Sequence, residues 1–184
     1  MLAELNRKGE ALELLRKIEP SFEGALEKEI IKAISYKING DLKKAIHVLR
    51  KVITKMEDDK NSQDQVRFED TSILLSKSLR ESGDSKGALL ALESALERNS
   101  NDLWLINSLA MEYANQNLNL EKGIKLINRA LKYQPANHIF LDTKGWLLFK
   151  SGRKEQAIDT INKSLALNPN CEETKEHSQA ILNS

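Results

Sequence analysis

The sequence is poor in the residues that characterise several classes of protein. Cys171 is the single cysteine, so no disulfide can form within the chain, and a lone cysteine fits a reducing compartment. Aromatic residues make up only 5% of the chain, and three prolines and eight glycines are too few for a low-complexity protein. No apolar run approaches the roughly 18 to 20 residues that a membrane span needs, so we expect no membrane insertion.

An excess of charge of either sign is also lacking. The chain carries 28 basic and 27 acidic residues, which leaves a net charge of +1. Proteins that bind nucleic acids usually have a basic excess, so the composition predicts no nucleic-acid partner. No cluster of His, Cys and acidic residues has the spacing of metal ligands, and no phosphate-binding glycine loop is present, so we expect neither a metal nor a cofactor.

The sequence is rich in apolar residues at the 3.6-residue period of an amphipathic helix, and it has no useful alternating stretch that would indicate a strand. The clearest example is the segment 138–169, which reads as two short helices joined by a tight turn. Gly145 lies where a second helix must come close, Gly152 ends the first helix, and Pro169 ends the second. We therefore expect an all-α protein.

A small residue in the second helix of such a pair recurs along the whole chain. Its positions, at intervals of 34, 43, 35 and 34 residues, are Ala11, Ala45, Ala88, Gly123 and Ala157. A nearly constant period of this length indicates a repeat protein, in which each helix pair packs on its neighbours.

Residues 138–169 resemble a tetratricopeptide repeat, a helix pair with a period of 34 residues. Counted from His138, the fourth, eighth, eleventh, twentieth, twenty-fourth, twenty-seventh and thirty-second positions of that unit are filled by Leu141, Gly145, Leu148, Ala157, Ile161, Ser164 and Pro169. The small residues and the proline match the family, whereas aliphatic residues replace its aromatic ones. The resemblance covers nearly the whole chain, is best over 103–169, and suggests a bacterial source.

The resemblance implies a right-handed α-solenoid of stacked antiparallel helix pairs, with about 4.5 repeats in one domain, 1–184. The expected units are a partial repeat, four repeats and a capping helix, at 1–22, 23–66, 67–101, 102–136, 137–170 and 171–184. The polar stretch from Met56 to Gln65 absorbs nine extra residues, and we expect it to extend the second helix of its unit and add a loop. The half repeat at the start favours a piece of a longer array. The localisation stays open: cytoplasmic by default, or periplasmic or envelope-associated within a longer bacterial protein.

Two short motifs resemble functional sites. The string GDSKG at 83–87 fits a serine nucleophile elbow, but it occupies the same place as the inter-helix turns of the other units, so we interpret it as a turn. Asn162-Lys163-Ser164 matches a glycosylation acceptor but lies inside a predicted packed helix. His47, His138 and His177 are dispersed, and we expect them to be solvated or partly packed.

The family resemblance implies a non-catalytic protein-interaction module that binds a peptide or a partner segment in a concave groove lined by the first helix of each pair. The groove positions fall on Ile30, Ile34, Lys37, Ile73, Lys77, Arg80, Trp104, Asn107, Met111, Asp142, Trp146, Phe149 and Lys150. The aromatic members could equally be packed core residues. A carboxylate clamp of the co-chaperone type is not expected, because apolar residues such as Ile30 and Ile34 stand where it needs Lys and Asn.

The alternative hypothesis is structural. The chain could be a segment of a larger solenoid, or it could form a homodimer through the N-terminal half repeat, where the apolar face of Leu12, Leu14, Leu15 and Ile18 lacks a cover. The sequence contains no recognisable catalytic set of residues, so we do not expect an enzyme.

Overall fold

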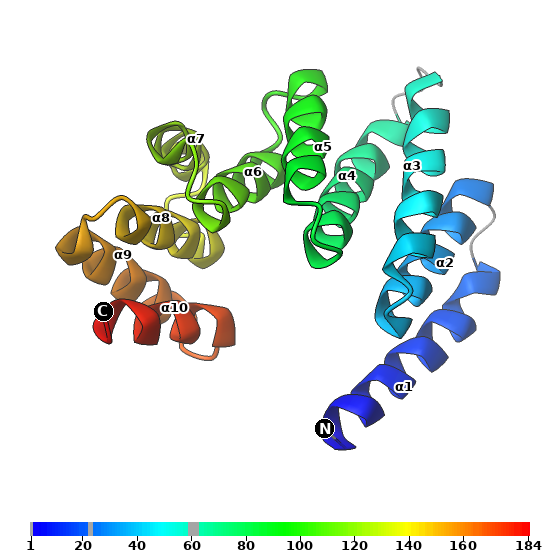
Figure 1. Ribbon diagram of the computed structural model, residues 1–184, viewed down its shortest axis with the longest axis horizontal. Helices are drawn as coiled ribbons and strands as arrows, with labels where there is room; N and C mark the ends of the chain where they lie inside the picture. Colours follow the sequence, from blue (N-terminus) through cyan, green and yellow to red (C-terminus); the bar gives the residue numbers. More distant parts are fainter. Residues whose placement is uncertain (1, 22–23, 59–62) are drawn as a thin grey trace. The chain divides into compact units, whose positions relative to one another are not determined.

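The structure, a computed structural model, describes residues 2–21, 24–58 and 63–184 (Figure 1). Within these residues it contains ten α-helices, one short 3-10 helix and no strand. In chain order the helices are α1 (Leu2–Ile18), η1 (Glu19–Ser21), α2 (Ala25–Asn39), α3 (Leu42–Asp58), α4 (Gln63–Glu81), α5 (Ser85–Arg98), α6 (Leu103–Asn115), α7 (Leu120–Tyr133), α8 (His138–Lys150), α9 (Lys154–Leu167) and α10 (Glu172–Leu182). The predicted all-α fold is confirmed. No helix in the described parts of the chain is long and apolar enough to cross a membrane.

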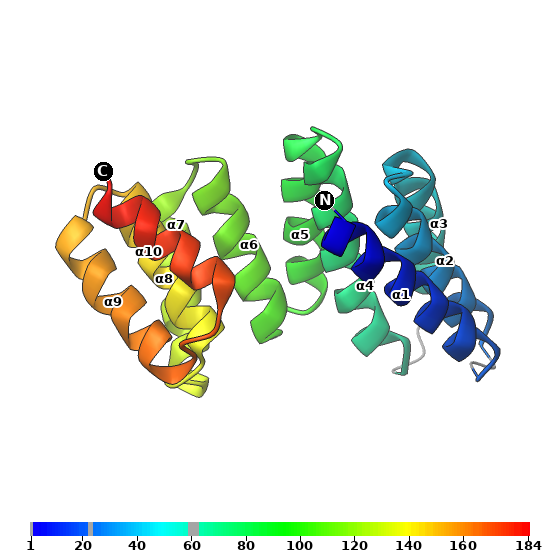
Figure 2. The ribbon, with the colours of Figure 1, turned by 90° about the horizontal axis from the view of Figure 1, so that it is seen from below.

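The helices divide into two compact units, Met1–Ala95 and Leu96–Ser184. In the first unit, α2 packs against α1 and α3, and α3 packs against α4. In the second unit, α6 and α10 both contact α8, while α7 and α9 pack beside them as the second helices of their pairs (Figure 2). Each unit is thus built from adjacent helix pairs, as predicted. The grouping of all the repeats into one domain with the predicted boundaries stays a prediction.

The turns inside the helix pairs have one geometry. Gly40, Gly83 and Gly152 adopt φ angles of 84°, 91° and 80°. After Gly152 the amide of Arg153 donates to the carbonyl of Leu148 at 2.9 Å, and the same pattern follows Gly40 and Gly83. This left-handed C-cap satisfies carbonyls that the helix end leaves open, and glycine adopts it without steric cost. Between α6 and α7, Asn117 takes the place of glycine at φ 52°, because asparagine is one of the few other residues that enter the left-handed region.

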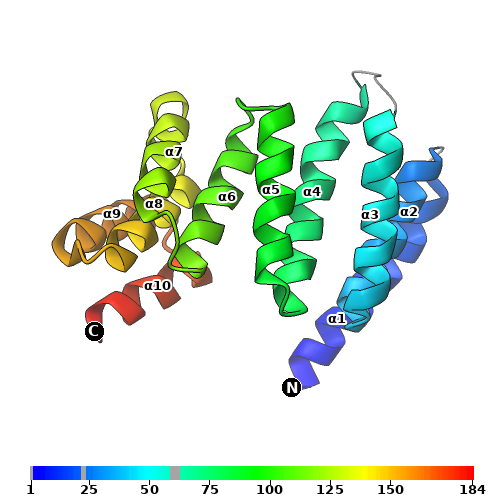
Figure 3. The same ribbon diagram turned by 45° about the horizontal axis from the view of Figure 1, so that its top comes forward.

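The polar insert forms more helix than expected. The helix α3 continues to Asp58 and α4 already begins at Gln63, so the insert lengthens the last helix of one pair and the first helix of the next. Both are long, with 17 and 19 residues (Figure 3). Residues 59–62 lie outside the described residues. Met, Glu, Lys and Gln, which are good helix formers, make up five of the ten residues of the insert.

The core of the second unit depends on a close approach between α8 and α9. Gly145 lies at that crossing, and a Cβ atom there would stand 2.6 Å from Cγ1 of Ile161. The surrounding cluster includes Phe140, Leu147, Ala157 and Ile161, all 1% exposed or less. Ser164 is fully buried, and its hydroxyl donates to the carbonyl of His138 at 2.7 Å, which ties α9 to the start of α8.

Candidate functional site

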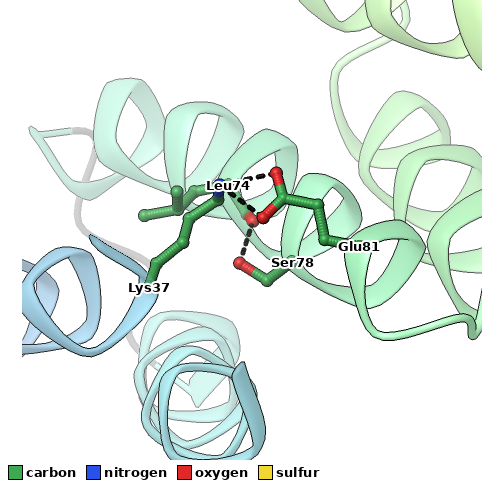
Figure 4. Close-up of polar contacts among 4 residues, drawn as sticks. All are labelled: Lys37, Leu74, Ser78 and Glu81. Atoms are coloured by element: carbon green, nitrogen blue, oxygen red, sulfur yellow. Dashed lines mark hydrogen bonds and ion pairs between the residues drawn. The ribbon is translucent and has the colours of Figure 1, made fainter. Parts of the chain in front are cut away.

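The groove positions predicted in the first unit lie on α2 and α4. Ile30, Ile34 and Ile73 are half-buried, and Lys77 is exposed. Lys37 extends from α2 towards α4, where its Nζ donates to both carboxylate oxygens of Glu81 at 2.6 and 2.8 Å (Figure 4). Arg80 is half-buried one residue before Glu81. Lys37 therefore already forms an ion pair with Glu81, and this pair is partly exposed to solvent.

On α6, the three predicted positions differ in their surroundings. Trp104 is 46% exposed, and its ring meets the buried ring of Phe140 on α8 edge-on, with centroids 5.3 Å apart. Met111 is half-buried. The Oδ1 atom of Asn107 is buried and has no hydrogen-bond partner among the described residues. The start of this helix is well defined, because the side chain of Asp102 caps it by accepting from the amide of Leu105 at 2.7 Å.

On α8, the predicted positions gather around one ring. The ring of Trp146 stacks on His177 of α10 at 4.3 Å and lies 5.3 Å from that of Phe149. The Nζ of Lys150 lies 4.7 Å from the centroid of Trp146, a cation–π distance. The indole Nε1 of Trp146 is buried, and no acceptor within the described part of the chain reaches it. Four aromatic or charged side chains thus form a single packed group.

Asp142, also on α8, is held by the C-terminal helix. Its side chain is 5% exposed, and Nδ1 of His177 lies 3.0 Å from each of its carboxylate oxygens. Because an ionised carboxylate can only accept hydrogen bonds, Nδ1–H is the donor in the tautomer of His177 that makes this contact. Sequence reasoning treated His177 only as a dispersed histidine and missed this contact. The predicted capping helix could have indicated this contact, because one face of such a helix must pack on the last helix pair.

The GDSKG string, which resembles a nucleophile elbow, forms a turn between two helices. The GDSKG string begins at the end of α4 and runs into α5, and Oδ1 of Asp84 caps α5 by accepting from the amide of Gly87 at 2.8 Å. A nucleophile elbow follows a strand, whereas a helix precedes this turn. The interpretation as a turn is confirmed. Among the described residues, no group of three or more His, Cys, Asp or Glu could hold a metal ion.

Comparisons with known proteins agree with the predicted family. Residues 140–171 match the sequence model of the tetratricopeptide repeat. A comparison with curated proteins gave no significant match.

Solved structures similar to this chain extend the likeness beyond that one repeat. A thermophilic TPR protein of Thermus thermophilus is similar with a TM-score of 0.73 and 18% identity, covering 100% of this chain and 94% of that one. YrrB, described as a TPR protein with an unusual peptide-binding site, has a TM-score of 0.63 and 18% identity, covering 97% and 87%. An O-GlcNAc transferase mutant of Thermobaculum terrenum has a TM-score of 0.57 and 18% identity, but the match covers 64% of this chain and only 22% of that protein.

At these identities the solved structures establish the fold, and the sequence match establishes the repeat itself. Stacked helix pairs of this kind create extended concave surfaces that repeat proteins use for binding. Residues 140–171 are therefore a tetratricopeptide repeat by sequence, and the chain shares the fold of solved tetratricopeptide repeat proteins.

Proposed function

We propose that the chain is a non-catalytic scaffold that binds a peptide or a segment of a partner protein along the predicted groove positions of α6 and α8. The observation that carries the proposal is Trp104, a large aromatic side chain that is 46% exposed near the start of α6, while Ile139 at the start of α8 is 37% exposed. Tryptophan is enriched among the residues that dominate binding energy at interfaces. The peptide-binding site described for the similar structure YrrB supports the same kind of function.

Polar groups at the same positions add to this proposal. The buried Oδ1 of Asn107 and the buried Nε1 of Trp146 are an acceptor and a donor without partners in the described part of the chain. A buried polar atom without a hydrogen bond costs on the order of 1 to 3 kcal/mol. A bound segment that shifts these side chains can donate a backbone amide to Oδ1 of Asn107 and offer a backbone carbonyl to Nε1 of Trp146. These hydrogen bonds would offset part of that free-energy cost.

The predicted groove positions of the two units differ in character, and each unit is considered by itself. The apolar anchors belong to α6 and α8, whereas Ile30, Ile34, Lys37, Ile73, Lys77 and Arg80 supply apolar and basic contacts on α2 and α4. Lys37 would need to exchange Glu81 for an acidic group of the ligand. We therefore expect Trp104 to dominate affinity in the second unit, and the basic residues of the first unit to orient any acidic segment that binds there.

The test is selection of peptides from a random displayed library with the intact chain, followed by affinity measurement with the selected peptide. Trp104→Ala should weaken binding by about 2 kcal/mol or more, as expected for a central aromatic anchor. The matched control is Tyr133→Ala, which removes another exposed aromatic ring, 74% exposed, outside the groove positions. Equal losses in the two variants, or no enriched peptide, would contradict the proposal.

A second candidate, self-association, is favoured by the surface of α1. Leu14 is 59% exposed and Ile18 is 37% exposed on this helix. A second copy that covers them would form the homodimer considered above, and a neighbouring repeat of a larger solenoid would cover them equally well. Sedimentation over a wide range of concentrations separates these cases, because Leu14→Lys should shift a dimer to monomer. A mass that stays monomeric at every concentration would exclude the homodimer.

A further inference from the structure

A basic hollow lies between α2 and α3, on residues that the predicted groove does not use. Its volume is about 400 Å³. Its lining, which carries four lysines and one histidine, consists of Glu29, Lys32, Tyr36, Lys43, Lys44, His47, Val48 and Lys51. The net charge of the chain, +1, conceals this local concentration of positive charge.

The charges in the hollow are mostly uncompensated. Lys44 contacts Asp41 at 3.2 Å and lies 5.5 Å from the ring centroid of Tyr36. Lys32, Lys43 and Lys51 are exposed, and none of them forms an ion pair or hydrogen bond with another residue that the structure describes. Glu29 is the one carboxylate in the lining. Cations that are close together and unpaired favour binding of an anion.

The helix pair α8–α9, which is the fifth predicted repeat (137–170), can be compared with the pair α2–α3, which is the second (23–66). It has a hollow of about 420 Å³ between α8 and α9, lined by Lys144, Leu148, Glu155, Gln156, Asp159, Thr160 and Lys163. Counted from Leu26 in one repeat and from His138 in the other, these residues occupy the same seven positions of the unit as Lys32, Tyr36, Lys43, Lys44, His47, Val48 and Lys51. The helix-pair fold therefore forms the hollow, and the side chains decide its charge.

Three substitutions account for the difference between the two hollows, and one of them is Gln156 in place of Lys44. Glu155 and Asp159 stand where the second repeat has Lys43 and His47. Asp159 also neutralises Lys163, whose Nζ lies 2.6 Å from its carboxylate. The other two complete repeats also lack the basic set, because Leu90 replaces His47 in one and Glu121 replaces Lys43 in the other.

The basic side chains on α3 form a row. Lys43, His47, Lys51 and Lys55 follow one another at intervals of four residues, and all four are exposed. Residues four apart in a helix share one face and rise about 6 Å along its axis. Alternate side chains of an extended peptide point to the same side and are separated by about 6.6 Å. An extended peptide with acidic residues at alternate positions therefore matches the row.

We propose that this basic hollow binds an acidic segment of a partner protein, in an extended conformation, with carboxylates paired to Lys43, Lys51 and Lys32. The surroundings disfavour other polyanions. Binding to single-stranded nucleic acid uses open aromatic platforms, whereas Tyr36 is half-buried under Lys44. Docking to an anionic lipid surface uses apolar side chains that insert, and no large exposed apolar side chain occurs on the described residues of α2 or α3.

The experiment measures fluorescence anisotropy of a labelled peptide of alternating Glu and Gly with the full chain, at low and at high ionic strength. The matching Gln–Gly peptide is the ligand control, and a single-stranded RNA oligomer and vesicles rich in phosphatidylserine test the two other classes of anion. We expect binding of the acidic peptide alone, weakened by salt because the contacts are ionic. Preferential binding of RNA or vesicles, or no binding of any probe, would overturn the proposal.

Variants copied from the fifth repeat test the site. Lys43→Glu with His47→Asp should weaken peptide binding about tenfold or more, because it reverses the charge of Lys43 and adds a carboxylate at the next position of the row. The control variant, Lys132→Glu with Lys154→Gln, makes a similar change in net charge at exposed positions elsewhere. An equal loss in both would mean that only net charge matters, which would overturn the proposal. The converse change, Glu155→Lys with Asp159→His, should raise affinity or add a second site, and no gain would count against the proposal.

Discussion

At the scale of single residues, small side chains determine how closely the helices of the second unit approach. A Cβ on Gly145 would meet Cγ1 and Cδ1 of Ile161 at 2.6 and 2.7 Å, and one on Gly123 would meet Cδ2 of Leu147 at 2.8 Å. Ile161 and Leu147 are buried in the same core, so neither can move away freely. Glycine is required here for space, whereas at Gly152 it is required for the left-handed backbone.

The lack of space beside Gly145 leads to a prediction for Gly145→Ala. Alanine raises helix propensity, but the new methyl group forces Ile161 out of its packing, so we expect a net loss of about 1 to 3 kcal/mol in the free energy of unfolding. Urea titration followed by tryptophan fluorescence measures this loss. Asn162→Ala, at an exposed position next to Ile161 on α9, should change stability by less than about 0.5 kcal/mol. A neutral or stabilising Gly145→Ala would show that the crossing is looser than the structure indicates.

At the scale of elements, the ends of the helices are defined by local caps and their positions by long-range contacts. Asn137 caps α8 by accepting from the amides of Ile139 and Phe140. The helix α10 has no side-chain cap at its N-terminus. Its contacts with α8 instead include the bond from His177 to Asp142 and the stack on Trp146. This single histidine therefore contributes much of the specific attachment of α10 to α8.

We expect His177→Ala to loosen α10. The substitution leaves the buried carboxylate of Asp142 without its hydrogen-bond donor, which costs on the order of 1 to 3 kcal/mol, and removes the ring that covers Trp146. The fluorescence of Trp146 should shift to the red as water reaches the indole, and hydrogen exchange in α10 should accelerate.

The control for this prediction is Glu176→Ala, at an exposed neighbouring position of α10. A double-mutant cycle with Asp142→Asn isolates the coupling between His177 and Asp142. Additive effects of the two substitutions would mean that the 3.0 Å contact contributes nothing beyond packing.

At the scale of the whole molecule, the chain forms two compact units, and its spectroscopic probes are distributed unevenly between them. Trp104 and Trp146 both belong to the unit Leu96–Ser184, so intrinsic tryptophan fluorescence reports that unit. Far-ultraviolet circular dichroism reports the helices of both units. The stability of repeat proteins is approximately a sum of local and nearest-neighbour terms, so a local change need not spread through the chain.

We therefore expect Gly145→Ala to shift the denaturation midpoint seen by fluorescence more than the midpoint seen by circular dichroism. The second signal averages over the unit that contains no tryptophan and is not altered by the substitution. The unmodified chain, measured with both probes in the same titration, is the reference. Equal shifts of both signals would indicate that the two units unfold as one cooperative body.

The sequence by itself determined the features that depend on local chemistry. The period of the small residues identified the repeats, and the turns at Gly40, Gly83, Gly152 and Asn117 were predictable because only a few residue types adopt a positive φ angle without strain. The match of residues 140–171 to the repeat family follows from the same local pattern.

The tertiary structure decided features that depend on residues far apart in the chain. Trp104 and Trp146 were predicted for the same groove, yet one is 46% exposed and the other is stacked on His177, because only folding brings α10 against α8. Asp142 became a buried hydrogen-bond acceptor for the same reason. The basic hollow was hidden by a balanced composition, because charge counted along a chain does not reveal which side chains two packed helices bring to one surface.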